Sequence, residues 1–158
     1  MEKVLQKLDE LDLQIIQFLQ NDGRVTFKEI AQSTGVAERT VRLRVMNLRD
    51  NNILQIIGVV NPISVGLKLI AMIQIAVEQN QIKLCIESLE SLDEVRFIAL
   101  TSGEYQLLIE VIAADHEEFG DFIENKLNCI PGIKKVNVTM ELKIIKNHFN
   151  FVKNLKDL

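Results

Sequence analysis

The chain has 158 residues, of which 47% are hydrophobic and 25% are charged, and its net charge is −4. These values indicate one globular domain or two small ones; they exclude a disordered chain and argue against a protein that coats nucleic acid indiscriminately. The longest apolar stretches, such as residues 69–77, are far shorter than the roughly 20 residues of a membrane span, and no signal-peptide pattern is present, so we expect a soluble cytoplasmic protein.

Positive charge is concentrated in one part of the first 60 residues. Residues 1–60 carry eight Lys/Arg and eight Asp/Glu, whereas residues 61–158 carry ten and fourteen. Four arginines lie within eleven residues that contain no acid: Arg39, Arg42, Arg44 and Arg49. Any contact with nucleic acid should therefore be confined to this segment.

Residues 9–34 are predicted to form two short helices. Asp9 is a suitable N-cap for the first, which ends at residues 21–23. Apolar side chains recur along it at the spacing of one helical face: Leu11, Ile15, Phe18 and Leu19. Residues 26–29 form a capping box, in which Thr26 and Glu29 each satisfy a free backbone N–H, and predict a second helix over 27–34.

A third helix is predicted over residues 36–51. Gly35 supplies the positive φ that ends the second helix, and Val41, Val45 and Leu48 then repeat on an inward face. Three short helices with a glycine turn between the last two are typical of a helix-turn-helix, although an ordinary small helical bundle has the same pattern.

The β-branched run over residues 53–60 predicts a strand that leaves the helical unit. Residues 61–66 are rich in turn formers and mark the candidate domain boundary. We therefore expect a helical domain over 1–60, a hinge over 61–68 and a second domain over 69–158.

The second domain is predicted to contain two similar halves. Its strands cover residues 69–78, 95–101, 106–112 and 133–142. Its helices cover residues 81–92 and 115–128, the latter capped by Asp115. Two βαβ halves joined at residues 102–105 describe an α+β fold, a ferredoxin-like βαββαβ sandwich with helices on one face of a four-stranded sheet.

The sheet face that the helices leave open is predicted to bind a second copy. Its apolar candidates are Ile73, Ile75, Leu108, Ile109 and Val111. The helix over 81–92 is predicted to pack through Leu84, Cys85, Ser88, Leu89 and Leu92. Because a half-covered apolar sheet usually finds a partner, we expect a homodimer through this domain.

The third helix is the candidate DNA-reading element. At 100° per residue, Arg39 and Arg42 point away from the inward face, with Leu43 and Met46 beside Arg39. A helix-turn-helix sends the start of its second helix into the major groove, where the arginine fork reads guanine O6 and N7. These four residues can therefore contact DNA together.

Further side chains near this helix are candidate phosphate contacts. Arg44 lies close to the inward face, where an ion pair with Asp12 is more natural than a base contact, and a phosphate contact is its alternative. The remaining DNA-binding candidates are Thr40, Arg49, Thr26 and Lys28. Simple solvation explains Thr40 equally well, and Thr26 is a weaker candidate because a capping box occurs in many helices that bind nothing.

No metal site, cofactor or catalytic centre is predicted. Cys85 and Cys129 stand 44 positions apart with no CxxC pair, so we expect free thiols. The two histidines, His116 and His148, are far apart in the sequence.

Several segments together carry a family resemblance. They are residues 8–12, 15–16, 19, 22–24, 29–31, 35–36, 39–45, 48, 61–62, 66–67 and 101–105. On these residues the chain resembles, over nearly its whole length, the Lrp/AsnC family of leucine- and asparagine-responsive regulators.

The resemblance implies a transcription regulator that binds double-stranded DNA through a winged helix-turn-helix. A hinge strand would join this part to a ligand-sensing βαββαβ domain, which dimerises through its sheets and assembles further into tetramers or octamers. A free amino acid would bind at the loop of Thr101, Ser102, Gly103, Glu104, Tyr105 and Gln106.

Two residues depart from the family pattern. Ala37 replaces the usual serine at the start of the third helix, which removes a cap worth about 1 kcal/mol. Gln106 replaces an aspartate placed to receive a ligand ammonium. A tight strand connection without a ligand is therefore the alternative for this loop.

Two other functions fit a two-domain plan. A sirohaem-decarboxylase-like enzyme needs histidines and arginines that line a cleft, and two histidines do not provide them. A metabolite-sensing oligomer without specific DNA readout has the same sequence features, so only an experiment separates it from a regulator.

Overall fold

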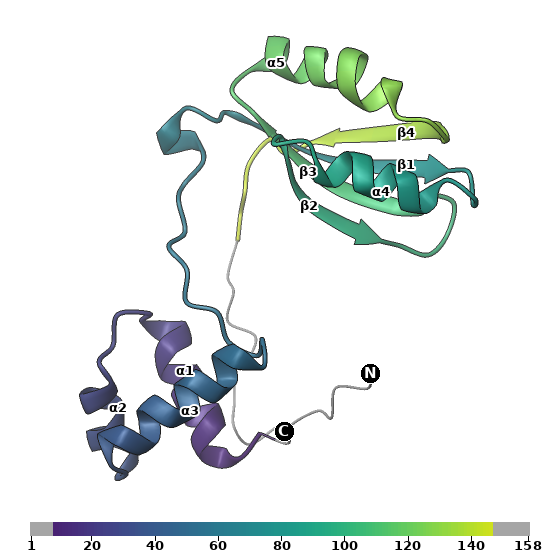
Figure 1. Cartoon of the computed structure of the whole chain (residues 1–158). Coiled ribbons are helices and arrows are strands. Elements are labelled where there is room, and N and C mark those ends of the chain that lie inside the picture. The colour runs from purple at the N-terminus through teal and green to yellow at the C-terminus, as the bar shows by residue number, and fades with distance from the viewer. Residues whose placement is uncertain (1–7, 147–158) are drawn as a thin grey trace. The chain divides into compact units, whose positions relative to one another are not determined.

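The computed structural model describes residues 8–146, which fall into two compact units. The first ends at Val59, and the second spans Val60–Ile145. The first unit is helical, whereas the second contains a sheet (Figure 1). Within residues 8–146, no helix is both long enough and apolar enough to cross a membrane.

The first unit is built from α1 (Glu10–Asn21), α2 (Phe27–Thr34) and α3 (Glu38–Asp50). The predicted caps are confirmed. The Asp9 carboxylate accepts the backbone N–H of Asp12 at 2.9 Å, and the Thr26 hydroxyl accepts that of Glu29 at 3.2 Å. Gly35 ends α2 with a φ of 73°, in the left-handed region that favours glycine.

One apolar cluster holds the three helices together. Val41, Val45 and Leu48 are buried and point inward from α3, as predicted. They pack in the same cluster as Ile15 of α1 and Ile30 of α2, which are fully buried. Because these contacts fix the inward side of α3, the opposite side is directed to solvent.

The segment after α3 does not form the predicted strand. Leu54 packs into the helical core, but Ile57 and Val59 are 72% and 70% exposed. A strand requires a neighbour for its backbone hydrogen bonds, and the described part of the first unit contains no strand that could pair with this one. The prediction of a strand over residues 53–60 is therefore wrong for the single chain.

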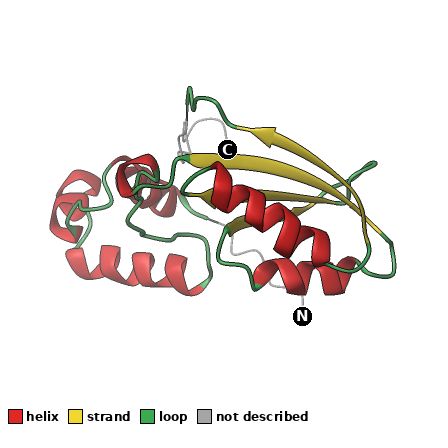
Figure 2. Cartoon of the chain, turned by 90° about the horizontal axis from the view of Figure 1, so that it is seen from above, coloured by secondary structure: helices red, strands yellow, loops and turns green. Residues whose placement is uncertain are grey.

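The second unit is an antiparallel sheet of β1 (Leu69–Val77), β2 (Val95–Leu100), β3 (Leu107–Ala113) and β4 (Ile133–Met140). The strands lie in the order β2-β3-β1-β4 (Figure 1) and are the yellow arrows of Figure 2. Helix α4 (Ile82–Glu90) joins β1 to β2, and α5 (His116–Asp121) begins the connection from β3 to β4. A short 3-10 turn, Ile63–Val65, precedes β1. The predicted α+β, ferredoxin-like βαββαβ order is confirmed.

The predicted helix over residues 115–128 is only partly α-helical. Asp115 caps it, accepting the backbone N–H groups of Glu117 and Glu118 at 2.9 and 3.0 Å. The α-helix then gives way to a π-helical segment, Phe122–Lys126, and a 3-10 turn, Leu127–Cys129. The fully buried side chains of Phe122 and Leu127 keep this irregular stretch packed on the core. Tertiary packing of this kind overrides local periodicity.

Four of the five residues predicted for the open sheet face are on the other face. Ile73, Ile75, Ile109 and Val111 are fully buried in the cluster that contains Cys85 and Leu89 of α4. The prediction was wrong because both faces carry apolar residues, so alternation alone does not tell which face the helices cover. Leu84, predicted to pack inward, is 57% exposed.

Strand pairing and alternation define the open face of the sheet. It carries Met72 and Gln74 of β1, Phe97 and Ala99 of β2, Leu108, Glu110 and Ile112 of β3, and Asn137 of β4. Arg96 at the edge of β2 forms an ion pair with Glu110, and the Asn137 amide donates to Gln74 Oε1 at 2.9 Å. The open face is therefore apolar with internally paired polar groups.

Candidate functional site

Four exposed side chains form one outer face of α3. Arg39, Arg42, Leu43 and Met46 all face solvent, and Leu43 and Met46 are each 52% exposed. We call these four residues the reading face. Two arginines beside two apolar side chains combine donors for base edges with groups that contact a thymine methyl.

Arg42 is held in place by two neighbours. Its Nη2 lies 3.2 Å from Glu38 Oε1, one helical turn earlier. Its guanidinium carbon lies 5.4 Å from the ring centroid of Phe27, in the first turn of α2. The i,i+4 spacing could have predicted the Glu38 pair, whereas the Phe27 contact depends on how α2 packs against α3.

Arg44 is turned away from the reading face, toward α1. Its Nη1 lies 2.6 Å from Asp9 Oδ2 and 3.1 Å from both carboxylate oxygens of Asp12. The predicted Arg44–Asp12 pair is confirmed, and Asp9 is a partner that sequence reasoning missed. The pKa of Asp9 is lowered, chiefly by the hydrogen bond from the Asp12 backbone and further by Arg44. The pKa of Arg44 is raised, chiefly by its hydrogen bond to Asp9.

The candidate phosphate contacts flank the reading face. Lys28 is exposed and Thr40 is half-buried. The Thr26 hydroxyl donates to Glu29 Oε2 at 2.7 Å, so its proton is used within the capping box. Ala37 precedes α3 without a side-chain cap, as its methyl group requires.

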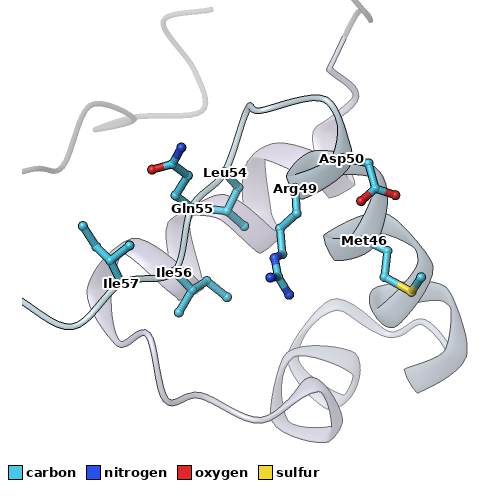
Figure 3. A pocket seen from close by; sticks show the side chains of 7 residues that line it. All are labelled: Met46, Arg49, Asp50, Leu54, Gln55, Ile56 and Ile57. Atoms are coloured by element: carbon cyan, nitrogen blue, oxygen red, sulfur yellow. The ribbon is translucent and has the colours of Figure 1, made fainter. Parts of the chain in front are cut away.

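Arg49 lies at a hollow that sequence reasoning missed. The hollow has a volume of about 460 Å³ and is lined by Met46, Arg49, Asp50, Leu54, Gln55, Ile56 and Ile57. Figure 3 shows the Arg49 side chain between Met46 of α3 and Ile56 of the following segment. Residues 54–57, which line the hollow, have no regular secondary structure where a strand was predicted.

The candidate effector loop, residues 101–106, is closed by its own hydrogen bonds. The Thr101 backbone N–H donates to the Gln106 carbonyl at 2.8 Å, and the Thr101 hydroxyl donates to the Tyr105 carbonyl at 2.7 Å. Gly103 has a φ of 107°, which favours glycine at this turn. Ser102 is exposed.

Gln106 uses its side-chain amide within the chain. Nε2 donates to the carbonyls of Gly103 and Glu104 at 3.1 Å each. Oε1 accepts the backbone N–H of Val77 at 2.9 Å, beside a register shift between β1 and β4. An aspartate has no amide donor, so the two bonds to the loop carbonyls depend on glutamine.

Lys135 of β4 reaches the same loop. Its Nζ lies 2.8 Å from Glu104 Oε1 and 5.2 Å from the ring centroid of Tyr105. The Glu104 hydrogen bond and, to a lesser degree, the Tyr105 interaction raise the pKa of Lys135. Sequence reasoning missed Lys135 because it stands 31 positions from Glu104.

The cysteines and the described histidine do not gather into a site. Burial raises the pKa of the Cys85 thiol, and Cys129 is exposed and free. Among the residues that the structure describes, no three His, Cys, Asp or Glu side chains are grouped to hold a metal ion. His116 begins α5, whereas His148 lies outside the described residues.

Comparison with known proteins decides the family. The model of the AsnC-type helix-turn-helix domain matches residues 8–49, and that of the Lrp/AsnC ligand binding domain matches residues 70–151. The chain belongs to the Lrp/AsnC family. Lrp/AsnC proteins are transcriptional regulators and not enzymes, which agrees with the prediction.

Relatives and solved structures span almost the whole chain. An uncharacterized HTH-type transcriptional regulator of Pyrococcus furiosus is 35% identical over 140 residues, covering 88% of this chain and 95% of that protein. The structure of E. coli AsnC has a TM-score of 0.84 at 25% identity and covers 90% of this chain and 97% of that one.

A second similar structure is a complex with an amino acid. It is a transcriptional regulator from Neisseria meningitidis in complex with L-Met, with a TM-score of 0.83 at 26% identity, covering 90% of this chain and 95% of that one. The present chain is thus a DNA-binding transcription regulator of the Lrp/AsnC type with a ligand-binding domain.

Proposed function

We propose that this regulator recognises a specific DNA sequence as a homodimer in the cytoplasm and responds to an amino acid. The main support for recognition of a specific DNA sequence is the composition of the reading face. Arg39, Arg42, Leu43 and Met46 project together from α3, whereas Arg44 is withdrawn into an ion-pair cluster with α1.

Arg42 is the principal candidate for base recognition. Glu38 and Phe27 restrict its side chain before DNA arrives, so less rotamer freedom is lost on binding. Arg39 is the second base contact, with Leu43 and Met46 against thymine methyl groups. We assign phosphate contacts to the side chains of Thr40, Arg49 and Lys28, and at Thr26 to the free backbone amides of the first turn of α2, because its hydroxyl proton is bonded to Glu29. Arg49 lies on the same side of α3 as Arg42.

We assign DNA binding to residues 1–60, the hinge to 61–68, and sensing and dimerisation to 69–158. The open sheet face supports a dimer, because Phe97 and Leu108 lie on it and Phe97 is 41% exposed. The exposed β-branched side chains of residues 53–60 are a further surface that a second copy can cover, and dimers can then assemble into tetramers or octamers.

A dimer should place two copies of α3 about 34 Å apart, which gives a palindromic DNA site with half-sites one turn of the DNA helix apart.

For the effector, we propose an amino acid that binds at Thr101, Ser102, Gly103, Glu104, Tyr105 and Gln106. The L-Met complex of the Neisseria meningitidis relative supports this class of ligand.

The test of DNA reading compares Arg42→Ala with Lys28→Ala on an operator selected from random sequences. Arg42→Ala should cost about 1–3 kcal/mol on the operator and relax the preference at one base pair. Lys28→Ala should weaken binding to all DNA sequences alike. It should also reduce the magnitude of the slope of log K for binding against log salt concentration by about 1. Both are measured by fluorescence anisotropy over a salt series.

Equal losses on operator and random DNA for Arg42→Ala would contradict its role in base reading. If selection enriches no sequence over random DNA, the proposal of specific recognition fails.

A further inference from the structure

One ammonium group of the chain itself lies at the effector loop. Lys135 Nζ is 2.8 Å from a carboxylate oxygen of Glu104 and 5.2 Å from the ring centroid of Tyr105. A carboxylate and an aromatic face are the two groups that bind a free ammonium ion most readily. In the loop, both of these groups contact the ammonium of one lysine from β4.

The rest of the loop offers no second anionic partner. Glu104 is the only acidic residue within residues 101–106. The Gln106 amide is neutral and is bonded to Gly103, Glu104 and Val77. An ammonium ligand that enters this loop therefore meets a single carboxylate that is already paired.

We propose that Lys135 is a built-in ammonium that occupies the cation position of the effector loop and competes there with the ammonium group of a free amino acid. The inference rests on the proposed role of residues 101–106 as the effector site. Its consequence is that the loop is internally occupied at low amino-acid concentration and responds only to ligand that displaces Lys135.

Displacement of Lys135 is sterically possible. The side chains of Lys135 and Glu104 are 57% and 69% exposed, so the lysine can swing into water. Exposed ion pairs and cation–π contacts are each weak, so their combined competition should reduce amino-acid affinity by no more than about tenfold. Lys135 thus sets the concentration at which the loop responds, and it does not block the loop permanently.

The first experiment tests the ammonium site without an amino acid. Tyr105 is the single tyrosine of the chain, which has no tryptophan, so its fluorescence reports on this loop alone. Lys135→Ala removes the part of the side chain that propylammonium replaces. We expect the substitution to change the fluorescence emission of Tyr105. Propylammonium chloride should restore the wild-type emission, whereas sodium chloride at the same concentration should not.

Lys134→Ala is the matched control. Lys134 is the adjacent lysine of β4, is 59% exposed and lies 3.9 Å from Glu78 instead of the loop. Its substitution should leave Tyr105 emission unchanged. If propylammonium and sodium chloride act alike on Lys135→Ala, the ammonium site is refuted.

The second experiment measures thermal shifts of the full chain with each of the twenty amino acids. We expect at least one amino acid to bind Lys135→Ala more tightly than the wild type and Lys134→Ala, by up to about tenfold. Equal affinity in all three proteins would overturn the competition and leave the effector role standing. Absence of any shift in all three would overturn both, while propylammonium rescue would still report the ammonium site.

Discussion

Arg44 is a basic residue of α3 that stabilises the helical unit through its ion pairs with Asp9 and Asp12. Its guanidinium joins α3 to the capping box of α1, where Asp12 is buried with 7% of its side chain exposed. A buried carboxylate without a cation is costly, so the pair stabilises the first unit mainly by preventing that state. The same contact turns one positive charge away from the reading face.

Arg44→Ala should therefore destabilise the helical unit by about 1–3 kcal/mol, because it leaves Asp12 buried without its cation. The measurement is urea unfolding followed by circular dichroism. Arg39→Ala, at an exposed position of the same helix, should change stability by no more than about 0.5 kcal/mol. Equal effects of the two substitutions would refute the structural role of Arg44.

At the scale of single elements, the absent cap of α3 distinguishes it from its neighbours. Carboxylate or hydroxyl groups cap α1 and α2, whereas Ala37 leaves the first N–H groups of α3 without a side-chain acceptor. Among the three helices, the first turn of α3 is therefore where an added cap should increase stability most.

Ala37→Ser should stabilise the first unit by about 0.5–1 kcal/mol, because a hydroxyl accepts an N–H of that first turn. Thermal unfolding measures the change. Ala37→Val adds a side chain without an acceptor and should give no gain. If serine and valine behave alike, capping does not limit the stability of α3.

Elements that local chemistry defines were predictable, and those that depend on distant contacts were not. Capping boxes and a left-handed glycine lie within a few residues, so α1, α2 and the start of α3 followed from Asp9, Thr26 and Gly35. The strand predicted over 53–60 is absent because it has no neighbouring strand with which to form backbone hydrogen bonds. Local sequence does not reveal whether such a neighbour exists.

The candidate site divides in the same way. Burial of Val41 set the angle of α3 and with it the outward direction of Arg39 and Arg42, so the reading face followed from periodicity. The contacts of Phe27 with Arg42 and of Lys135 with Tyr105 join different elements, and periodicity within one element does not predict them.

At the scale of the whole molecule, the proposed homodimer would use the open face of the sheet. Its polar groups are paired within the chain, Arg96 with Glu110 and Asn137 with Gln74, so covering it with a second copy leaves few polar groups without partners. A homodimer through this face is consistent with that pairing.

Leu108→Glu should convert the proposed dimer into a folded monomer, because Leu108 lies on the open face and each copy would bring a carboxylate into the apolar interface. Sedimentation equilibrium measures the mass, and circular dichroism checks the fold. Leu84→Glu, the same change on the exposed side of α4, should remain dimeric. A dimer that survives Leu108→Glu would place the interface elsewhere.

The two hydrophobic clusters draw their members from separate parts of the chain. One uses residues 8–54 and the other residues 69–136. A substitution that repacks one cluster therefore leaves the side chains of the other in place. Changes in operator preference and changes in ligand preference can accumulate independently during evolution, so one ancestral gene can give rise to regulators that pair the same sensor with new promoters.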